Sequence, residues 1–361
     1  MTSSRYIALV DLDAFYASVE VLEDETLRGK PLLIGGSPQS RGVIATASYE
    51  ARNFGCRSAM PVAQALKLCP DAILIEPKFE LYKRYSNQVM QILKQESDIF
   101  QQMSIDEAYL DLSKKCTSQK NAIEAAFHIK ARIHIDIGLP CSVGLASNKV
   151  VAKIACEYAK PNGFNVIPTG EESMFLSELD IRDLPGIGPK TTKRLNSVGF
   201  RKISDIANAT PKKLTQLIGS SGAVLHKYAN GNDDSPVSSE RITKSISAER
   251  TFNSDITYND GKEIDTLVVR LTNQVWESVN RKKLFPRTVS VKLRYSDFRT
   301  ISRSKTVDSE ITSNKAISDI ASELTKQTLY PSDRLRLIGL TVSNFYTHAR
   351  SSQLSFDNFL N

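Results

Sequence analysis

The sequence predicts a multidomain α+β protein, and its length and two stretches of mixed strands and helices carry this prediction. The chain has 361 residues, more than one ordinary hydrophobic core accommodates, so roughly two to four domains are expected. Residues 1–167 and 244–345 each combine strand-like apolar segments with amphipathic helices. Residues 183–195 are expected to form two short helical segments around a glycine-rich turn, and the polar, turn-rich residues 233–243 are expected to form a linker.

The composition excludes several classes of protein. Hydrophobic residues make up 41% and charged residues 24%, values typical of a globular domain in water. No leader-like start and no apolar segment of membrane-spanning length is found, so neither secretion nor membrane insertion is expected. The five cysteines are scattered without a Cys-x-x-Cys pair, and the four histidines are equally dispersed. We therefore expect a cytoplasmic protein without a zinc site.

Charge is distributed unevenly along the chain. Residues 1–179 contain 19 Lys and Arg against 21 Asp and Glu. Residues 180–243 contain 10 against 6, and residues 244–361 contain 18 against 13. A slightly acidic first region followed by basic ones fits a protein that binds a polyanion beside an acidic site.

The first α+β region is expected to begin with a strand at residues 6–10 that leads into a short helix at 15–21. A smaller mixed segment up to about residue 78 follows. The remaining expected elements are apolar segments at 31–34 and 42–47, helices at 61–69, 79–97 and 121–137, a strand hairpin around residue 106, and a strand at 141–145. This order predicts an antiparallel sheet with helices on one face.

Two acidic clusters, at residues 11–16 and 104–111, suggest a metal site in this region. The first follows the strand at 6–10, and the second lies on the expected hairpin. Hard cations such as Mg²⁺ prefer oxygen ligands and keep positions open for water and phosphate. Two such ions can activate a hydroxyl and stabilise a departing pyrophosphate. The alternative for either cluster alone is ordinary surface acidity.

A glycine-rich turn in the central region predicts contact with a nucleic-acid backbone. Residues 183–195 place Gly186 and Gly188 between two short helical segments, followed by Lys190 and Lys193. Glycines let backbone amides face outward, and a helix that starts at the turn can meet a phosphate. This helix-hairpin-helix pattern favours sequence-independent DNA binding over a plain helical hairpin.

The second α+β region is expected to have the order strand, helix, strand, strand, helix, strand. The strands are expected near 244–252, 288–295, 299–307 and 335–345, and the helices near 263–284 and 314–329. Alternation puts Val289, Val291 and Leu293 on the apolar face of the second strand, and Lys292 and Arg294 on its polar face. With Arg299, Arg303 and Lys305 on the next strand, we expect a basic sheet surface that contacts phosphates rather than a merely solvated face.

The last 16 residues, 346–361, show no periodicity but contain apolar side chains near the end. Gln353, Leu354 and Phe356 have the character of a short peptide that docks in a pocket of a partner protein.

Four segments in chain order resemble the Y-family DNA polymerases, in their DNA polymerase IV branch. These are residues 10–20, 45–52, 104–111 and 159–163, and the resemblance extends from about residue 6 to 345. It implies a right-hand polymerase. The implied domains are a ferredoxin-like palm with small fingers at about 20–78 within residues 1–167, a helix-hairpin-helix thumb at 168–232, the linker at 233–243, a βαββαβ little finger at 244–345, and a flexible tail at 346–361.

The resemblance also implies the catalytic residues. Asp11, Asp106 and Glu107 match the carboxylates that hold two Mg²⁺ ions, with Mn²⁺ as an alternative, and the Leu12 carbonyl is a further ligand. Glu107 would lie closest to the primer hydroxyl. On a continuing strand Asp13 would share a face with Asp11. The family does not use this position as a main ligand, so a structural role is expected for Asp13.

The incoming nucleotide has its own set of matching positions. Tyr49, Arg52 and Lys160 match residues that grip the triphosphate, and backbone amides at Phe15 and Tyr16 would help to cradle it. Tyr16 matches the steric gate, whose ring collides with a 2′-hydroxyl and so excludes ribonucleotides.

The implied activity is template-directed DNA synthesis. The chain would bind primer-template DNA and dNTPs as a monomer, with low fidelity, translesion synthesis and no proofreading exonuclease. The tail resembles a sliding-clamp binding peptide, although Asp357 after Phe356 departs from the usual ending. A nucleotidyl cyclase and a catalytically silent DNA-binding adaptor are the alternatives. A cyclase has no use for the hairpin or the second sheet, and the adaptor would lack acidic residues that this chain retains.

Overall fold

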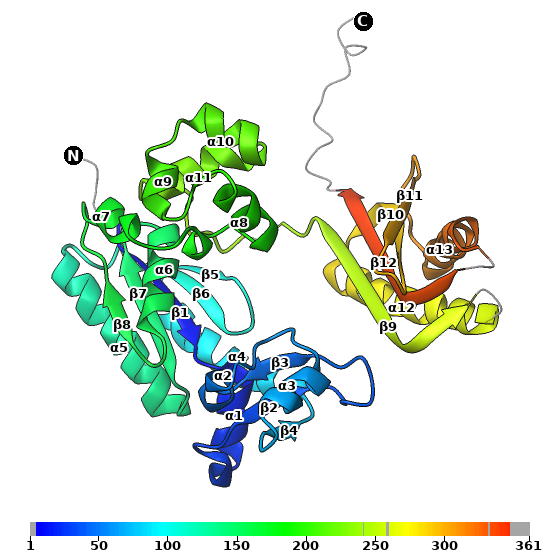
Figure 1. The fold of residues 1–361 in the computed structure, drawn as a ribbon, viewed down its shortest axis with the longest axis horizontal. Coiled ribbons are helices and arrows are strands. Elements are labelled where there is room, and N and C mark those ends of the chain that lie inside the picture. Colours follow the sequence, from blue (N-terminus) through cyan, green and yellow to red (C-terminus); the bar gives the residue numbers. More distant parts are fainter. Residues whose placement is uncertain (1–4, 241, 258–259, 331–332, 347–361) are drawn as a thin grey trace, which may run out of the picture. The chain divides into compact units, whose positions relative to one another are not determined.

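The computed structural model describes residues 5–240, 242–257, 260–330 and 333–346. The chain forms two compact units (Figure 1). The first comprises Met1–Ser37 and Gly42–Arg241, and the second comprises Pro38–Arg41 and Ile242–Asn361. No helix in the described segments is long and apolar enough to cross a membrane.

A five-stranded sheet forms the centre of the first unit. Its order is β5-β6-β1-β7-β8, where β1 spans Ile7–Leu12 and pairs antiparallel with both β6 (Glu107–Asp111) and β7 (Cys141–Ala146). The edges are β5 (Ile99–Gln102) and β8 (Phe164–Val166). When β1, β5, β6 and β7 are numbered 1 to 4 in chain order, their order across the sheet from β7 to β5 is 4-1-3-2. This is the order of a ferredoxin-like sheet and confirms the predicted fold class.

Both faces of this sheet are covered, so the prediction of helices on one face is wrong. Ala8 and Val10 pack in the cluster that contains α4 (Phe79–Glu96) and α5 (Gln119–Ile137). Ile7 and Leu9 instead pack with α6, Lys149–Ala159, which the sequence analysis did not predict. The signal was present, because residues 7–10 are entirely apolar, and strands without polar alternation are typically buried on both faces.

The edge strand β8 also departs from the predicted antiparallel arrangement, because it pairs parallel to β7 after the α6 crossover. Gly144 on β7 allows α6 to pack closely. A Cβ atom at this position would lie 2.1 Å from the Ala152 carbonyl oxygen.

A smaller three-stranded sheet with short helices forms the segment expected at 20–78. Its strand order is β3-β2-β4, and β4 runs parallel to β2. Helix α1 (Phe15–Glu23) leads into this part but packs in the core of the five-stranded sheet. The elements of this part are η1 (Glu25–Leu27), β2 (Leu32–Gly35), β3 (Ile44–Ala47), α2 (Tyr49–Asn53), α3 (Val62–Leu68) and β4 (Ile73–Ile75). A small core that includes Leu33, Ile44 and Val62 holds it together.

The region after β8 is helical, as predicted. Its elements are α7 (Glu172–Ser177), η2 (Ile181–Asp183), α8 (Pro189–Asn196), α9 (Ile203–Ala207), α10 (Pro211–Ile218) and α11 (Ser221–Ala229). Leu184, Leu195 and Leu225 are buried in the same cluster as α6 of the sheet domain. This continuous core ties the helices to the sheet.

The first half of the expected linker is fastened to the sheet domain. The Arg5 guanidinium donates to the carbonyl oxygens of Asp233 and Ser235 at 3.1 and 2.9 Å. Lys149 Nζ donates to the Pro236 carbonyl at 3.0 Å, and Val237 is buried in the core. Side-chain donors that satisfy successive backbone carbonyls hold this stretch in one path.

We expect Arg5→Ala to loosen this stretch without unfolding the unit. Losing two hydrogen bonds of about 0.5–1.5 kcal/mol each should raise local opening several-fold. Limited proteolysis checks this, with cleavage near residues 233–238 expected about fivefold faster than in the wild type. Arg28→Ala is the control, because Arg28 is exposed and contacts only Glu25 among the pairs seen here. Equal cleavage of both variants would show that Arg5 does not hold the segment.

The second unit has the predicted βαββαβ order. Its elements are β9 (Ser245–Thr257), α12 (Gly261–Lys282), β10 (Phe285–Tyr295), β11 (Thr300–Thr306), α13 (Asn314–Thr328) and β12 (Arg334–Tyr346). The strands form an antiparallel sheet in the order β11-β10-β12-β9, and both helices pack on one face. Val289, Val291 and Leu293 point into this core, as their alternation predicted.

The prediction that one face of this sheet is basic is only partly correct. Arg303 pairs with Val291 and Lys305 with Val289, and directly opposed residues share a face. Both cations therefore lie on the helix side, where Lys305 Nζ contacts Glu323 on α13 at 2.8 Å. The opposite face carries Lys292, which pairs with Glu249, and Arg294. The rest of that face on β10 and β11 is rich in hydroxyls, from Thr288, Ser290, Ser302, Ser304 and Thr306.

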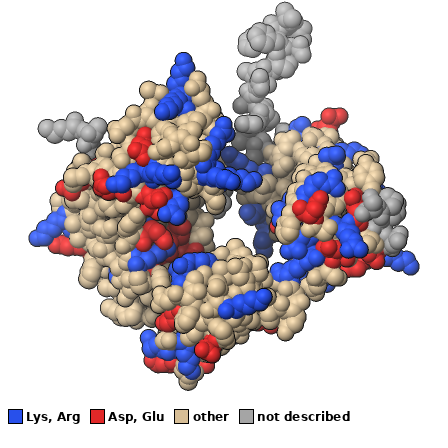
Figure 2. Space-filling model, in the orientation of Figure 1, with Lys and Arg blue, Asp and Glu red and all other residues tan. Residues whose placement is uncertain are grey.

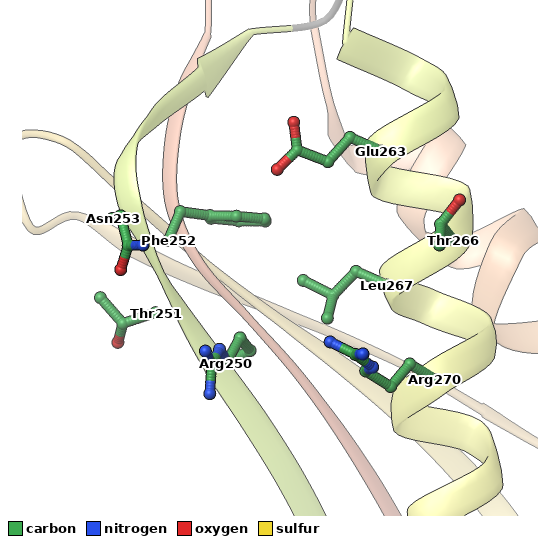
Figure 3. Close-up of a pocket in the computed structure, with 8 residues that line it drawn as sticks. All are labelled: Arg250, Thr251, Phe252, Asn253, Glu263, Thr266, Leu267 and Arg270. Carbon is green, nitrogen blue, oxygen red and sulfur yellow. The ribbon is translucent and has the colours of Figure 1, made fainter.

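A pocket of about 330 Å³ lies between β9 and α12 of the second unit (Figure 3). Phe252 and Leu267 contribute its apolar wall. Arg250 and Arg270 lie toward one end, and Glu263 lies toward the other (Figure 3). Basic and acidic side chains are interspersed over the visible surface of this unit (Figure 2).

Candidate active site

Three carboxylates gather on two neighbouring strands of the five-stranded sheet. Asp11, near the end of β1, lies directly opposite Glu107, the first residue of β6. Asp106 precedes β6, and its carbonyl oxygen accepts a hydrogen bond from the Leu12 N–H at 3.0 Å. The antiparallel pairing of β1 and β6 thus brings together the two acidic clusters that the sequence separates.

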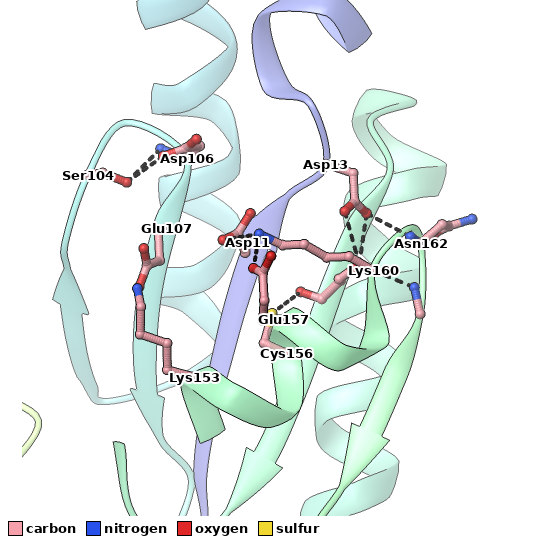
Figure 4. Close-up of polar contacts among 12 residues, drawn as sticks. Asp11, Asp13, Ser104, Asp106, Glu107, Lys153, Cys156, Glu157, Lys160 and Asn162 are labelled. Atoms are coloured by element: carbon pink, nitrogen blue, oxygen red, sulfur yellow. Dashed lines mark hydrogen bonds and ion pairs between the residues drawn. The ribbon is translucent and has the colours of Figure 1, made fainter. Parts of the chain in front are cut away.

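Two lysines from α6 and its C-terminal end contact this cluster (Figure 4). Lys160 Nζ lies 2.9 Å from Asp11 Oδ2 and 2.8 Å from Glu157 Oε2. Lys153 Nζ lies 2.6 Å from Glu107 Oε1. The Asp106 carboxylate accepts a hydrogen bond from the Ser104 hydroxyl.

Burial and neighbouring charges perturb the pKa values of Asp11 and Lys160. Burial raises the pKa of Asp11 to about 6, the nearby Asp106 and Glu107 charges act in the same direction, and Lys160 only partly opposes them. Burial disfavours the Lys160 ammonium, but Asp11 and Glu157 outweigh it and raise the pKa of Lys160. A bound cation would favour the ionised form of Asp11.

The donor atoms fit a hard divalent cation. All three side chains offer carboxylate oxygens, the ligands that Mg²⁺ prefers. In the described part of the chain, no group of three or more His, Cys, Asp and Glu side chains is already arranged to hold a metal ion. The ammonium groups of Lys153 and Lys160 instead provide the positive charge beside Glu107 and Asp11. Leu12 lies next to Asp11 and its side chain is buried.

Asp13 lies apart from Asp11, Asp106 and Glu107 (Figure 4) and accepts hydrogen bonds from three other residues. Strand β1 ends at Leu12, and Ala14 adopts a left-handed conformation with φ of 43°. Asp13 is 2% exposed and accepts hydrogen bonds from the Tyr49 hydroxyl at 2.9 Å, from the Ser142 hydroxyl at 2.9 Å and from the Asn162 N–H at 2.8 Å. These contacts support a structural role.

The residues expected at the triphosphate lie around the same place. Tyr49 and Arg52 are on α2, and the Arg52 guanidinium lies 4.7 Å from the centre of the Tyr49 ring. Arg52 Nε also donates to the Ala47 carbonyl oxygen at 3.0 Å. The Tyr49 hydroxyl donates a hydrogen bond to Asp13, and the Lys160 ammonium donates one to Asp11. The end of β1, helix α2 and the end of α6 therefore meet here.

The other two nucleotide-site residues begin helix α1. Phe15 is buried in the core, so only its backbone can face a ligand, whereas Tyr16 is half-buried. The Tyr16 ring stacks on Tyr82 of α4.

The expected DNA-contact residues fall into two groups. Gly186 and Gly188 are exposed in the turn before α8, and Lys190 and Lys193 are exposed on α8 itself. Gly186 has a φ of 98°, which favours glycine. In the second unit Lys292 and Arg294 share one sheet face, and Arg303 lies on the other. Arg299 lies over the Tyr295 ring at 4.4 Å. The expected clamp-binding residues Gln353, Leu354 and Phe356 lie outside the described residues.

Sequence reasoning missed Lys153 and the helix that carries it. The apolar residues Val150, Val151 and Ile154 recur at helical spacing, and Asn148 caps the helix by accepting from the Val151 N–H at 3.1 Å. An Asn before such a pattern is a usual helix start. With α6 in place, Lys153 would have been expected on the same side as Glu157.

Comparisons with known proteins place the chain in a family. The family model described as impB/mucB/samB matches residues 10–157, and the C-terminal domain model of that family matches residues 243–356. A SAM-like helix-hairpin-helix tandem matches residues 178–224. The tandem extends past the predicted turn into the α10–α11 hairpin, which the sequence analysis did not identify.

Proteins that align with nearly the whole chain are DNA polymerases. DNA polymerase IV from Clostridium perfringens (strain 13 / Type A) is 38% identical over 361 residues, which is 99% of this chain and 100% of the relative. Among solved structures, a Y-family DNA polymerase chimera aligns with a TM-score of 0.86, and DinB from Sulfolobus solfataricus aligns with a TM-score of 0.65. Each of these is 32% identical and covers 94% of this chain and 99% of its own.

Proposed function

Since the chain belongs to the impB/mucB/samB family, the Y-family of DNA polymerases, and within it to the DNA polymerase IV type, we propose that it extends a DNA primer with template-directed dNTPs. Its enzyme class is DNA-directed DNA polymerase. One observation carries the finer proposal: Asp11, opposite Glu107 and beside Asp106, lies next to the Tyr49, Arg52 and Lys160 group.

In this proposal Asp11, Asp106 and Glu107 hold two Mg²⁺ ions, or Mn²⁺, with the Leu12 carbonyl as a further ligand. When bound, such ions activate the primer 3′-hydroxyl and neutralise the departing pyrophosphate. Glu107 is the carboxylate nearest the primer hydroxyl. Lys153, whose Nζ lies 2.6 Å from Glu107 Oε1, orients the Glu107 carboxylate.

The nucleotide is held by side chains around Asp11 and Asp13. Arg52 offers a planar fork to the phosphate oxygens, and Lys160 offers a point charge. A triphosphate competes with Asp11 for the Lys160 ammonium. Asp13 orients the Tyr49 hydroxyl, and backbone amides at Phe15 and Tyr16 face the phosphates from the start of α1.

We propose low fidelity, translesion synthesis and no proofreading for this chain. The part expected to close over the nascent base pair consists of short elements, with α2 five and α3 seven residues long. Such a small lid selects weakly for the shape of the pair. The exposed turn at Gly186 and Gly188 and the polar sheet face with Lys292 and Arg294 would bind the backbone of primer-template DNA.

The domain limits, monomeric state, cytoplasmic location and clamp binding through Gln353, Leu354 and Phe356 belong to the same proposal. Five buried cysteines without a disulfide fit the reducing cytoplasm.

Primer extension tests the proposal. A labelled primer on a longer template is incubated with Mg²⁺ and one dNTP at a time, and we expect addition only of the nucleotide that the template specifies. A protein that binds primer-template without extending it in Mg²⁺ or Mn²⁺ would be a DNA-binding adaptor. Conversion of a free nucleoside triphosphate to a cyclic product without primer would indicate a cyclase.

We expect Tyr16→Ala to admit ribonucleotides. Removing the ring opens space for a 2′-hydroxyl, so the preference for dNTP over rNTP, measured as the ratio of kcat/KM values, should fall by at least about 100-fold. Ile133→Val is the control, because the Ile133 side chain is buried in the core on α5. An unchanged ratio for Tyr16→Ala would remove Tyr16 from the role of gate.

A further inference from the structure

The gate residue Tyr16 belongs to one of two residue pairs that face each other on α1 and α4. The two members of each pair are one helical turn apart. Tyr16 and Glu20 lie on α1, and Lys78 and Tyr82 lie at the start of α4. Residues four apart share a helix face, so each pair presents its two side chains together. The Tyr82 N–H donates to the Lys78 carbonyl at 3.1 Å, which fixes the second pair on the first turn of α4.

The two tyrosine rings of these pairs are stacked. The ring centres of Tyr16 and Tyr82 are 4.2 Å apart, with an angle of 13° between the ring planes. Phe79, one residue after Lys78, meets the Tyr16 ring edge-on at 6.2 Å. Phe15 contacts the Tyr16 ring at 5.5 Å. The Tyr16 ring therefore rests on one fully buried ring and is bordered by two others.

A buried carboxylate fastens the supporting ring. The Tyr82 hydroxyl donates to Glu20 Oε1 at 2.7 Å, and Lys78 Nζ lies 2.6 Å from Glu20 Oε2. The Glu20 side chain is 3% exposed, and Tyr82 is fully buried. A buried carboxylate is tolerated only where its oxygens are satisfied, so the hydrogen bond and the ion pair hold one arrangement of Glu20 and Tyr82.

We propose that Tyr82, held by Glu20 and Lys78, is a positioning residue that fixes the ring of Tyr16 and thereby sets the discrimination between deoxyribose and ribose. This inference rests on the proposed function, in which Tyr16 is the gate. A gate rejects a 2′-hydroxyl only if its ring cannot retreat, because a displacement of about 1 Å accommodates much of a clash. The stack blocks retreat toward α4, and the Glu20 contacts prevent Tyr82 from moving with the gate.

The test measures sugar selectivity rather than activity alone. Single-nucleotide extension gives kcat/KM for a dNTP and for the rNTP of the same base in the wild type, Tyr82→Leu, Tyr82→Phe and Glu20→Ala. Leu93→Ala is the control, because Leu93 is buried in α4 about three turns beyond Tyr82. Thermal unfolding of each variant is recorded alongside.

Tyr82→Leu removes both the stacked ring and its hydroxyl. We expect its preference for dNTP over rNTP to fall by about tenfold or more, mainly through an increase in kcat/KM for the rNTP relative to the dNTP. Tyr82→Phe keeps the ring, and Glu20→Ala keeps both rings, but each breaks the same hydrogen bond. Both should lower the preference by about threefold. Glu20→Ala already removes the bond to Tyr82 together with the Lys78 ion pair, so combining it with Tyr82→Phe should lower the preference no further than Glu20→Ala alone.

Leu93→Ala should lower the melting temperature and leave the sugar preference unchanged, as a purely structural effect does. If Tyr82→Leu does not fold, Tyr82→Phe and Glu20→Ala decide. Wild-type preference in all soluble Tyr82 and Glu20 variants, while Tyr16→Ala admits ribonucleotides, would overturn the inference and leave the proposed function intact. Failure of Tyr16→Ala to admit them would overturn both the gate and its support, and failure of the wild type to add any dNTP would overturn the proposed function itself.

Discussion

Replacing Asp106 and Glu107 together by alanine is expected to lower the rate of templated nucleotide addition by at least about 1,000-fold. The two residues lie at the start of β6, with Glu107 opposite Asp11. Their loss removes the carboxylate oxygens that would hold divalent cations beside the primer terminus. Single-turnover primer extension with saturating dNTP measures the chemical step, and chelation of Mg²⁺ should stop the wild type in the same assay.

The double variant should bind primer-template DNA as the wild type does, because the expected DNA contacts lie elsewhere. Its fold should also persist, because both side chains are partly exposed at a strand end. Asp111→Asn is the matched control on the same strand. Asp111 Oδ1 accepts from the Ser113 N–H at 2.9 Å, and an asparagine keeps that acceptor. Wild-type rates in the double variant would show that catalysis does not depend on this acidic cluster.

Much of the site could be anticipated because sheet geometry and sequence agree there. A strand that ends at Asp11 and a hairpin that presents Asp106 and Glu107 need only pair to bring the acids together, and β1 and β6 do so. The alternation of Val289, Val291 and Leu293 likewise predicted the core face of β10. Periodicity within one element is local information, and it survives folding.

The face of Arg303 could not be anticipated in the same way. Which side of a hairpin a residue takes depends on the register, and a shift by one residue moves every side chain to the other face. The β10–β11 turn includes Phe298, a bulky residue with φ of 65°, and the Tyr295 N–H donates to the Arg299 carbonyl across it. An aromatic residue in a left-handed conformation is unusual. No sequence pattern in the turn predicts the register of β11 against β10.

Asp13 shows a different limit of the sequence analysis: its position fits the alternation of a strand, but the strand ends one residue earlier. Alternation would have placed Asp13 beside Asp11 on a longer strand. The left-handed residue Ala14 ends that geometry, and Asp13 joins Tyr49, Ser142 and Asn162 instead. Three partners at separations of 36, 129 and 149 residues are long-range contacts that a local reading does not contain.

This network leads to the second large effect: Asp13→Ala should destabilise the first unit by about 3 kcal/mol. Hydrogen bonds to a charged group contribute about 1.5–3 kcal/mol, and donors left unsatisfied in a buried place add a desolvation penalty. The loss of Asp13 removes the acceptor from Tyr49, Ser142 and Asn162 at once. Urea unfolding checks this, with a lower midpoint at an unchanged slope.

Two control variants for stability, together with a Mg²⁺-binding measurement, distinguish a structural Asp13 from a metal ligand. Asp98→Ala, at a side chain that is 65% exposed, should leave stability within about 0.5 kcal/mol of the wild type. Asp13→Asn keeps one acceptor oxygen and should lose less stability than Asp13→Ala. Asp11→Ala should lose nucleotide-dependent Mg²⁺ binding. If Asp13→Ala unfolds like the wild type but loses this binding too, Asp13 is a metal ligand and its hydrogen bonds only orient its carboxylate. A loss of stability with Mg²⁺ binding retained in the folded protein would establish that Asp13 holds the strand end, the Tyr49 hydroxyl and the loop at Asn162 in place around the acids.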